Sequence, residues 1–543
     1  MSKTPFIPSR HQAAVFDFVS TGTGSAIIEA VAGAGKTTTI VKALELIDPK
    51  ARTMFLAFNK KIATELQAKV PAHVKAATFH SQGFNAWRKW MGNVATPNAN
   101  KIRELIKRNF APMEAEAFGA TIARLVSVAK SAGVGALVSD TEETWQGLAD
   151  HYDINLPDGD DMRKRTLEAA SYLLSLSVDA AMASPSVIDF DDMLYMPLLK
   201  EVPFAKVDFL FVDESQDTNA VQLALLRRML VPGGRLIAVG DPRQAIYGFR
   251  GADASAMKNL QEAFNCITLP LTISYRCAQA IVKQAQTIVS HIEASPTAIM
   301  GEVLSATVEK TEFRNTDAII CRNTAPVVEL AYQLIGKGIG CKVLGREIGQ
   351  ALNTLIKQMG ASDLDTMIAK LDEFRARETA KFMAKGQEQR AEAVNDKVDC
   401  IHAIVNNLTE TARSLTGLYG AIDRMFSDDA GSERLTLCTA HKSKGLEWKR
   451  VFVYRPELMP SKYARQAWQQ EQESNLQYVA WTRAMETLVF LSQGTPAAAP
   501  LKTASVAAPA VKLTYCQRQQ AAIAAGTLAP SAFWLDMMED VAS

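Results

Sequence analysis

Short, mostly apolar runs recur along the chain and alternate with stretches of helical periodicity. The run Ala26-Ile27-Ile28 belongs to this alternation in the first 90 residues, and residues 207–212 resume it. Such runs are typical of parallel strands that are covered on both faces. Their alternation with helices predicts an α/β fold built on doubly wound sheets. Further strand candidates are residues 236–239, 318–321 and 451–454.

Two regions interrupt this pattern with helical periodicity and few strand signals. We interpret them as helical insertions, one in each of two α/β domains. The first domain is expected to comprise residues 1–90 and 185–262, with residues 91–184 inserted. The second is expected to comprise residues 263–348 and 433–493, with the shorter insertion 349–432. Residues 494–543 are expected to form a flexible linker and tail.

The tail is rich in alanine and proline from Gly494 to Pro509 and lacks an apolar period, which predicts flexibility. Acidic and aromatic residues alternate from Phe533 to Asp540. This segment is expected either to dock a protein partner or to pack back as a small helix. The first alternative makes the tail a possible partner-binding segment.

Composition narrows the class of protein. A chain of 543 residues is too long for one hydrophobic core and favours several domains. A formal net charge of +1 argues against a uniformly basic coat, although a local basic channel remains compatible with it. The seven cysteines include no Cys-x-x-Cys pair, so neither a zinc site nor a disulfide framework is indicated. No signal peptide or membrane-spanning run is apparent, so we expect a cytoplasmic or nucleoid-associated protein that does not bind membranes.

The first strand candidate runs directly into a glycine-rich turn and a helix. Gly33 and Gly35 allow backbone N–H groups to close around phosphate oxygens, and the helix N-terminus adds its positive dipole end. Lys36 can reach the terminal phosphates, while the Thr37 hydroxyl suits Mg²⁺. Ala30 replaces the usual first glycine of the P-loop, and a chance glycine-rich turn is the alternative. The predicted nucleotide-binding residues here are Ala32, Gly33, Ala34, Gly35, Lys36, Thr37 and Thr38.

A second strand, residues 207–212, ends in Asp213-Glu214. A carboxylate at this end of a parallel strand lies beside the P-loop in α/β NTPases. Asp213 is the predicted Mg²⁺ ligand together with Thr37, and Glu214 is predicted to activate the attacking water. An acidic turn without function is the alternative, and pairing with the P-loop favours catalysis.

Residues 236–239 are followed by a polar and then an aromatic segment. Gln244 is placed to sense the γ-phosphate. Tyr247, Phe249 and Arg250 combine two rings with a cation beside the nucleotide site, which suits stacked bases and a phosphate contact. Packing of the two rings in a core is the alternative.

The order of these motifs resembles the UvrD/Rep-type superfamily 1 DNA helicases, from about Gln12 to Phe490. The resemblance implies two RecA-like P-loop NTPase domains that use ATP and Mg²⁺. It implies that Gln12 reads adenine and that Tyr275 stacks on it. Arg276 and Arg483 would contact the γ-phosphate, and Glu447 the ribose. The Phe-Asn-Lys form and the Gly-Asp-Pro-Arg-Gln loop are similar to the F-box DNA helicase branch, although no F-box is apparent.

The same resemblance implies a track for single-stranded DNA. One part lies in two loops of the first domain, and the other in a loop of the second. The segment Asp189-Phe190-Asp191-Asp192-Met193 also resembles a family segment that precedes the Asp-Glu strand. The implied DNA-binding residues are Phe58, Asn59, Thr78, Phe79, His80, Tyr247, Phe249, Arg250, Thr439 and His441.

The resemblance therefore implies an ATP-dependent motor that acts on single-stranded DNA and on junctions with duplex, moving 3′ to 5′. Two alternatives remain open at the level of sequence. One is a translocase that displaces proteins from DNA without processive unwinding. The other is a motor or switch subunit of a nuclease or defence complex.

Overall fold

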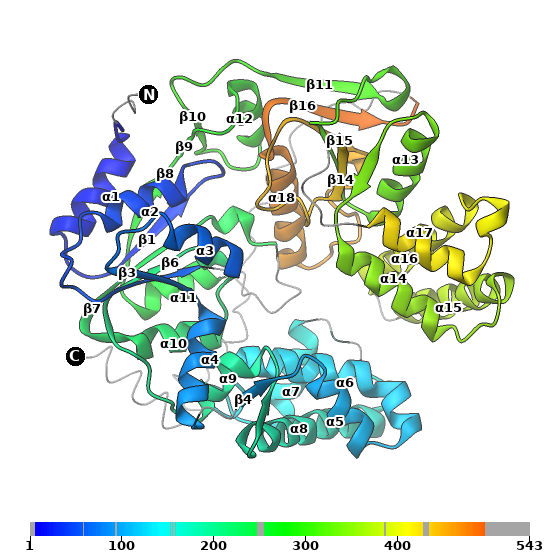
Figure 1. The fold of residues 1–543 in the computed structure, drawn as a ribbon, viewed down its shortest axis with the longest axis horizontal. Helices are drawn as coiled ribbons and strands as arrows, with labels where there is room; N and C mark the ends of the chain where they lie inside the picture. The colour runs from blue at the N-terminus through cyan, green and yellow to red at the C-terminus, as the bar shows by residue number, and fades with distance from the viewer. Residues whose placement is uncertain are drawn as a thin grey trace. The chain divides into compact units, whose positions relative to one another are not determined.

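A computed structural model describes residues 6–57, 59–92, 95–152, 154, 156–157, 159–246, 255–384, 387–426 and 434–494. These residues fall into two compact units, which Figure 1 shows as a ribbon. The first unit contains the described residues up to Ala30 and those from Lys36 to Leu271. The second contains Val31–Gly35 and the described residues from Thr272 onward. Each unit is built around one parallel sheet.

The sheet of the first unit has six strands in the order β3-β2-β6-β7-β1-β8, and every pairing in it is parallel. The strand β2 is buried throughout, and β6 and β7 are buried over their C-terminal parts, from Leu210 and from Leu236, which explains the apolar residues there. The elements around this sheet are α1 (Arg10–Thr21), β1 (Ala26–Ala30), α2 (Lys36–Leu44), β2 (Thr53–Ala57), α3 (Lys60–Gln67), β3 (Val74–Thr78), α4 (Phe79–Trp90), α9 (Asp192–Leu199), β6 (Val207–Val212), η1 (Ser215–Asp217), α10 (Ala220–Met229), β7 (Leu230–Gly240), η2 (Pro242–Gln244), α11 (Ala256–Ala263) and β8 (Ile267–Leu271).

The strand β8 extends this sheet beyond the expected end of the first domain at residue 262. It pairs with β1 from Ala26 opposite Ile267 to Ala30 opposite Leu271. Three of its five residues are exposed, so its sequence does not show the continuous apolar signal of a central strand. The position of β8 in the sheet is set by its hydrogen bonds to β1. The first unit therefore includes β8 and extends to Leu271.

A helical region with its own core is inserted between α4 and α9. Its helices contact one another in sequence order and lie together in Figure 1. Trp87, which belongs to α4, and Trp145 are both buried in this core. A short two-stranded ladder pairs Ala95 with Ser186, which the sparse strand signals did not predict. Its elements are β4 (Ala95–Pro97), α5 (Lys101–Asn109), α6 (Pro112–Ala132), α7 (Glu142–His151), α8 (Asp160–Met182) and β5 (Ser186–Ile188).

The sheet of the second unit also has six parallel strands, in the order β11-β16-β15-β12-β14-β13. Its elements are β9 (Ile273–Ser274), α12 (Gln279–Ala285), β10 (Glu293–Ala294), β11 (Glu302–Thr307), η4 (Val308–Lys310), β12 (Ala318–Cys321), α13 (Thr324–Gly336), β13 (Cys341–Val343), α14 (Arg346–Gln358), α15 (Leu364–Ala384), α16 (Glu388–Asn406), η5 (Glu410–Ala412), α17 (Leu415–Met425), β14 (Leu435–Thr439), β15 (Trp448–Tyr454), η6 (Pro456–Leu458), α18 (Ala467–Trp481) and β16 (Ala484–Ser492).

The helices α14 to α17 of the second unit do not have a separate core. Leu352 of α14, Ile401 of α16 and Ile422 of α17 belong to the same apolar cluster as Ile319 of β12. Helices α13 and α16 also pack closely. This inserted region is therefore an integral layer of the second unit.

The predicted fold class is confirmed, since both units are α/β with a parallel sheet and inserted helices. Cys321 of β12 and Cys438 of β14 are fully buried. Within the described ranges, no helix combines the length and the apolar character needed to cross a membrane.

Candidate functional site

The loop between β1 and α2 has the backbone that its glycines predict. Gly33 and Gly35 both have φ of +73°, in the left-handed region that favours glycine. A Cβ atom at Gly33 would lie 2.5 Å from Cβ of Arg276 and 2.8 Å from Oγ of Ser274. The Tyr275 N–H donates to the Gly33 carbonyl at 2.8 Å. Gly33 is therefore required both by its conformation and by close packing.

Three neighbouring strands of the first sheet, β1, β7 and β6, are parallel, so their C-terminal ends lie at the same edge of the sheet. A polar residue follows each of them there. Lys36 follows β1, Asp213 follows β6 and Asp241 follows β7. Nζ of Lys36 lies 3.1 Å from Oε1 of Glu214. Burial opposes the charge of Lys36, but the carboxylates of Glu214, Asp213 and Asp241 outweigh it and raise the Lys36 pKa. The structure thus joins the predicted phosphate-binding lysine, Lys36, and the glutamate predicted to activate water, Glu214.

Glu214 has a backbone conformation that is uncommon for a residue other than glycine. Its φ is +50° and its ψ is 42°, in the left-handed region. Its N–H donates to Oδ1 of Asp213 at 2.9 Å. Burial, and then the charge of Glu214, raise the pKa of Asp213 to about 6. Backbone strain of this kind tends to occur at functional sites, because the surrounding structure must stabilise it.

Two side chains that were not assigned as site residues organise this acidic group. Gln216 donates through Nε2 to Oε2 of Glu214, and its Oε1 accepts from the Asp241 N–H at 3.1 Å. Asp241 in turn accepts from Nε2 of Gln244 at 2.8 Å. A Cβ at Gly240 would lie 2.4 Å from Oε1 of Gln216, so this glycine makes room for the amide. The signal was present in the sequence, because both residues lie inside the motifs that contain Glu214 and Gln244.

These residues fit a nucleoside triphosphate with Mg²⁺. The Thr37 and Thr38 side chains are exposed at the start of α2, whereas Asp213 is buried beside Lys36 and Glu214. A hydroxyl and a carboxylate are oxygen ligands that Mg²⁺ accepts, with phosphates and water completing its shell. In the described part of the chain, no group of three or more His, Cys, Asp or Glu residues could hold a metal by itself.

The predicted adenine-reading glutamine is held in place by its neighbours. Gln12 is 3% exposed and completes a capping box with Ser9 at the start of α1. Its Nε2 donates to Oγ1 of Thr39 in α2 at 3.0 Å. Gln12 is thereby attached to the helix that follows the phosphate loop.

Arg276 and Glu447, both predicted nucleotide ligands, pair with each other in the second unit. Nε of Arg276 lies 2.6 Å from Oε2 of Glu447, and Nη1 donates to the Thr482 carbonyl at 3.4 Å. Tyr275, the predicted adenine-stacking residue, is 49% exposed. An exposed ring beside an arginine is compatible with stacking on a base.

Arg483 lies just after α18 and is 1% exposed. Its guanidinium donates to the carbonyls of Val479 at 2.9 Å and Leu446 at 3.2 Å. Tyr478, also from α18, accepts at its hydroxyl from the Ala32 N–H at 2.8 Å. Arg483 is therefore a buried arginine whose guanidinium serves backbone carbonyls.

The predicted DNA-binding loops of the first unit use their polar residues as helix caps. Asn59 caps α3 by accepting from the Ile62 N–H at 2.9 Å. Thr78 caps α4 by accepting from the Ser81 N–H at 3.1 Å. Phe79 is packed in the hydrophobic core and is 6% exposed. That placement favours a packing role for Phe79.

His80 stacks on Phe190, with ring centroids 3.7 Å apart and planes at 19°. Phe190 is 61% exposed, although a large apolar side chain is usually buried. Burial lowers the pKa of His80 to about 4, so its ring is neutral near pH 7. Phe190 lies in a motif that the sequence identifies, but it is not among the predicted DNA-binding residues. Its exposure is visible only in the structure.

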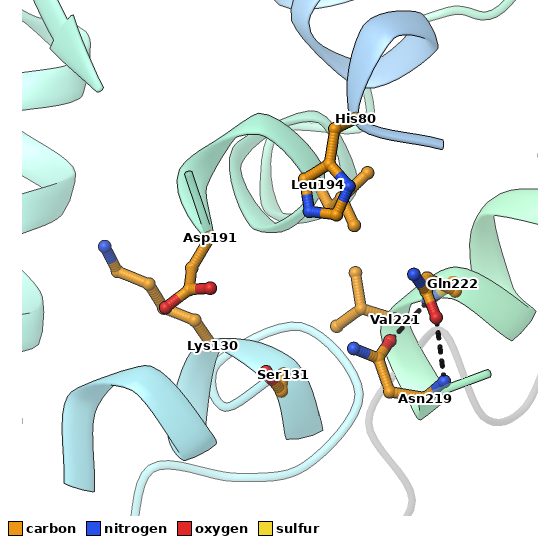
Figure 2. Close-up of a pocket in the computed structure, with 8 residues that line it drawn as sticks. All are labelled: His80, Lys130, Ser131, Asp191, Leu194, Asn219, Val221 and Gln222. Carbon is orange, nitrogen blue, oxygen red and sulfur yellow. Dashed lines mark hydrogen bonds between the residues drawn. The ribbon is translucent and has the colours of Figure 1, made fainter. Parts of the chain in front are cut away.

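Beside His80 lies a small polar pocket of about 40 Å³. Figure 2 shows His80 and Leu194 on one side, Lys130 and Asp191 on a second, and Asn219 with Gln222 on a third. Asn219 and Gln222 exchange two hydrogen bonds of 2.9 Å at the start of α10. Burial raises the pKa of Asp191, which accepts from Oγ of Ser127 at 2.8 Å.

The remaining predicted DNA-binding residues are placed only in part. Thr439 is buried at the end of β14, and His441 is partly exposed in the loop that follows. Phe58, Tyr247, Phe249 and Arg250 lie outside the described residues, as does the tail from residue 495.

Comparison with known proteins gives two matches to family models. Residues 12–265 match the UvrD/REP helicase N-terminal domain, and residues 350–493 match the UvrD-like helicase C-terminal domain. F-box DNA helicase protein 1 of Schizosaccharomyces pombe is 26% identical over 85% of this chain and 55% of its own length. ATP-dependent DNA helicase Rep of Buchnera aphidicola is 26% identical over 52% of this chain and 43% of its own. ATP-dependent DNA helicase PcrA of Staphylococcus epidermidis is 26% identical over 50% of this chain and 39% of its own length. The chain thus spans about half the length of these relatives, or less.

Proposed function

Because the chain belongs to the UvrD/Rep-type family of superfamily 1 helicases, we propose that it hydrolyses ATP to move along single-stranded DNA and separate duplex strands. The observation that carries the proposal is the cluster of Lys36, Asp213 and Glu214 where neighbouring strands end beside a glycine-rich loop. Relatives named as ATP-dependent DNA helicases support the same substrate class.

In this proposal the first unit supplies the hydrolytic chemistry. The ammonium of Lys36 exchanges Glu214 for the terminal phosphates of ATP. Glu214 then orients the attacking water and accepts its proton, while the Gln216 amide holds the carboxylate. Thr37 and Asp213 would hold Mg²⁺, which neutralises developing phosphate charge when bound.

We propose that Arg276 and Arg483 of the second unit contact the γ-phosphate. Arginine is suited to this role because its planar fork of donors matches phosphate oxygens. Such arginines contribute about 10³–10⁵ in rate in other NTPases. Arg276 is neutralised by Glu447, and Arg483 donates to the carbonyl of Val479. Exchange of these partners for phosphate would make the second unit sensitive to the nucleotide state.

The single strand would lie over the face that presents His80 and Phe190. An exposed ring held against a second ring is a stacking platform for a base, at about 1–3 kcal/mol per base. Because His80 is neutral near pH 7, it would act through stacking and hydrogen bonding. Thr78, Asn59, Thr439 and His441 remain proposed neighbours of the strand.

The polarity of movement is proposed to be 3′ to 5′, on the similarity of the segments 240–252 and 478–484 to that branch of the family. The test is ATP hydrolysis with and without single-stranded DNA, followed by strand separation on duplexes with a 3′ tail, a 5′ tail or blunt ends. We expect DNA to stimulate hydrolysis and only the 3′-tailed duplex to be separated efficiently.

Each outcome of this test bears on a different part of the proposal. A preference for the 5′ tail at equal length and salt would reverse the polarity and leave the motor intact. DNA-stimulated hydrolysis without separation of any duplex would favour a translocase that displaces proteins. Hydrolysis that ignores DNA would contradict the proposed function.

A further inference from the structure

Two lysines of the inserted helical region are buried in the first unit against two aspartates. Lys101 of α5 is 2% exposed, Lys130 of α6 is 1% exposed and Asp192 at the start of α9 is fully buried. Asp189, three residues earlier, is 8% exposed. Lysine and aspartate are seldom buried to this extent unless they are paired. Lys101, Lys130, Asp189 and Asp192 together form the Lys–Asp cluster.

The contacts of the Lys–Asp cluster are short and connect four helices, α5, α6, α8 and α9. Nζ of Lys130 lies 2.6 Å from Oδ2 of Asp189 and 2.7 Å from Oδ1 of Asp192. Nζ of Lys101 lies 2.6 Å from Oδ2 of Asp192 and donates to the Ser177 carbonyl of α8 at 2.6 Å. Burial opposes the charge of Lys130, but the two carboxylates outweigh it and raise its pKa. Lys130 is therefore charged at neutral pH.

The two aspartates also close the turn on which they lie. The Asp189 N–H donates to Oδ2 of Asp192 at 2.9 Å, and the Asp192 N–H donates to Oδ1 of Asp189 at 2.8 Å. Between them stands Phe190, exposed and stacked on His80. The backbone that carries the stacking ring is thus attached through both its ends to lysines of the helical insertion.

Stability alone does not explain this arrangement. Burying several ions costs free energy that their attraction only partly offsets, and well-packed apolar residues are often as stable at such places. What ions provide is directional specificity, because a displaced partner leaves a buried charge unpaired. A displacement of the turn of residues 189–192 would therefore leave a buried charge unpaired.

We propose that Lys101 and Lys130 are positioning residues for the DNA-binding face, which hold the turn 189–192 so that Phe190 remains stacked on His80 and available to a base. This inference rests on the proposed function, because it assumes that Phe190 contacts single-stranded DNA. It assigns to the helical insertion a part in setting the affinity for the strand.

The test compares four variants of the full chain, and one control variant, with the wild type. Lys130→Met removes the central cation, and Asp189→Asn is a milder change that leaves Lys130 paired with Asp192. Phe190→Ala removes the stacking ring. The loss of DNA affinity in this variant is the largest loss that mispositioning of the ring can cause. The double variant Lys130→Met with Phe190→Ala shows whether the lysine acts through the ring. Lys42→Met is the matched control, because it removes an exposed ion pair with Glu45 from the same unit.

Three quantities are measured for each variant. The affinity for a fluorescent oligothymidine is measured at fixed salt, and the oligothymidine concentration that half-stimulates ATP hydrolysis is measured beside the basal rate. Thermal unfolding gives the folded fraction, to which each affinity is normalised. If Lys130→Met does not fold, the same comparison is made with Asp189→Asn alone and combined with Phe190→Ala.

We expect Phe190→Ala to weaken binding between about 5-fold and about 150-fold, which corresponds to about 1–3 kcal/mol for one stacked base. Lys130→Met should weaken binding by a large part of that factor, with the basal rate unchanged. The double variant should bind no more weakly than Phe190→Ala. Lys42→Met should behave as the wild type.

The inference is overturned if Lys130→Met and Asp189→Asn lower thermal stability but leave the affinity per folded molecule unchanged. It is also overturned if the effects of Lys130→Met and Phe190→Ala multiply in the double variant, since the lysine would then act independently of the ring. In both cases the wild type still binds DNA and the proposed function stands. A wild type without affinity for oligothymidine would overturn both.

Discussion

Lys36 and Glu214, which are 178 residues apart in the sequence, form an ion pair of 3.1 Å at the edge of the first sheet. Glu214 is held there in a left-handed backbone conformation, and Gln216 donates to its second oxygen. The lysine that would bind phosphate is therefore neutralised by the carboxylate that would activate water. A triphosphate would separate the two groups and free each for its role.

The first prediction separates those two roles. Lys36→Ala should abolish both tight ATP binding and hydrolysis, because the cation for the phosphates is lost. Glu214→Gln should bind ATP at least as well as the wild type and lose about 10²-fold or more in turnover, since the amide cannot accept a proton. Nucleotide affinity and turnover at saturating ATP are to be measured side by side.

The control is Lys42→Ala, which changes an exposed residue of α2, the helix that begins at Lys36, and should remain active. Wild-type turnover in Glu214→Gln would refute the assignment of the base.

The second prediction concerns Gly33. Gly33→Ala should lose nucleotide affinity and hydrolysis, because an alanine at φ of +73° is strained by about 1–2 kcal/mol and its Cβ would lie 2.5 Å from Cβ of Arg276. Gly24→Ala is a matched control, since Gly24 has φ of +74° and open space around its Cβ position. Gly24→Ala should lower the melting temperature because of the same backbone strain, but it should bind ATP as the wild type does. Equal activity of the two variants would show that the close approach has no consequence.

The third prediction concerns Arg483. Arg483→Lys should retain most nucleotide affinity and lose turnover, because a lysine keeps the charge but not the planar fork that suits the transition state. Arg483→Ala should in addition lower the melting temperature, since it removes a buried guanidinium that serves backbone carbonyls.

Arg235→Lys provides the comparison for Arg483→Lys. Arg235 donates to the carbonyls of Phe18, Val19 and Gly24, so its replacement also removes a guanidinium from backbone acceptors. It should lower stability and leave turnover per folded molecule unchanged. A large loss of nucleotide affinity in Arg483→Lys, with turnover at saturation intact, would contradict the proposed role of Arg483.

The fourth prediction follows from the pKa of His80, which burial lowers to about 4. The unfolded chain binds a proton at His80 below about pH 6.5, whereas the folded chain does so only below about pH 4. Between these values the unfolded state holds more protons, so stability rises with pH across this window. His80 should contribute on the order of 2–3 kcal/mol to that rise, and His80→Gln should flatten it in urea unfolding.

Because His80 is already neutral above pH 6, it should add no pH dependence to DNA binding near neutrality. The ratio of oligothymidine affinities between the wild type and His80→Gln should be constant from pH 6 to pH 8 at fixed ionic strength. A ratio that grows toward pH 6 would mean that a protonated His80 contacts the phosphates, contrary to its burial.

Much of the architecture could be predicted from local pattern. Continuous apolar runs predicted the central strands β1, β6 and β12, and the two left-handed glycines were expected from the phosphate-loop motif. These features depend on the period of the side chains and on which residues tolerate positive φ, so they can be recognised within a few neighbouring residues. The motif order then led to the helicase family that the comparisons confirm.

The pairing of distant residues was decided by the tertiary structure alone. The strand β8 looks weak in sequence but completes the first sheet beside β1. Phe79 and Phe190 are both aromatic residues in recognisable motifs, yet one is in the core and the other is exposed against His80.

Lys101 and Asp192 show the physical reason most clearly, because 91 residues separate them in the chain. On a helix, a lysine is ordinarily solvated, and nothing in its local sequence states that a carboxylate will meet it in the interior. Periodicity and turn chemistry act over a few residues and so determined the elements, the phosphate loop and the family. Burial and ion pairing depend on which elements pack together, and only the folded chain brings those groups into contact.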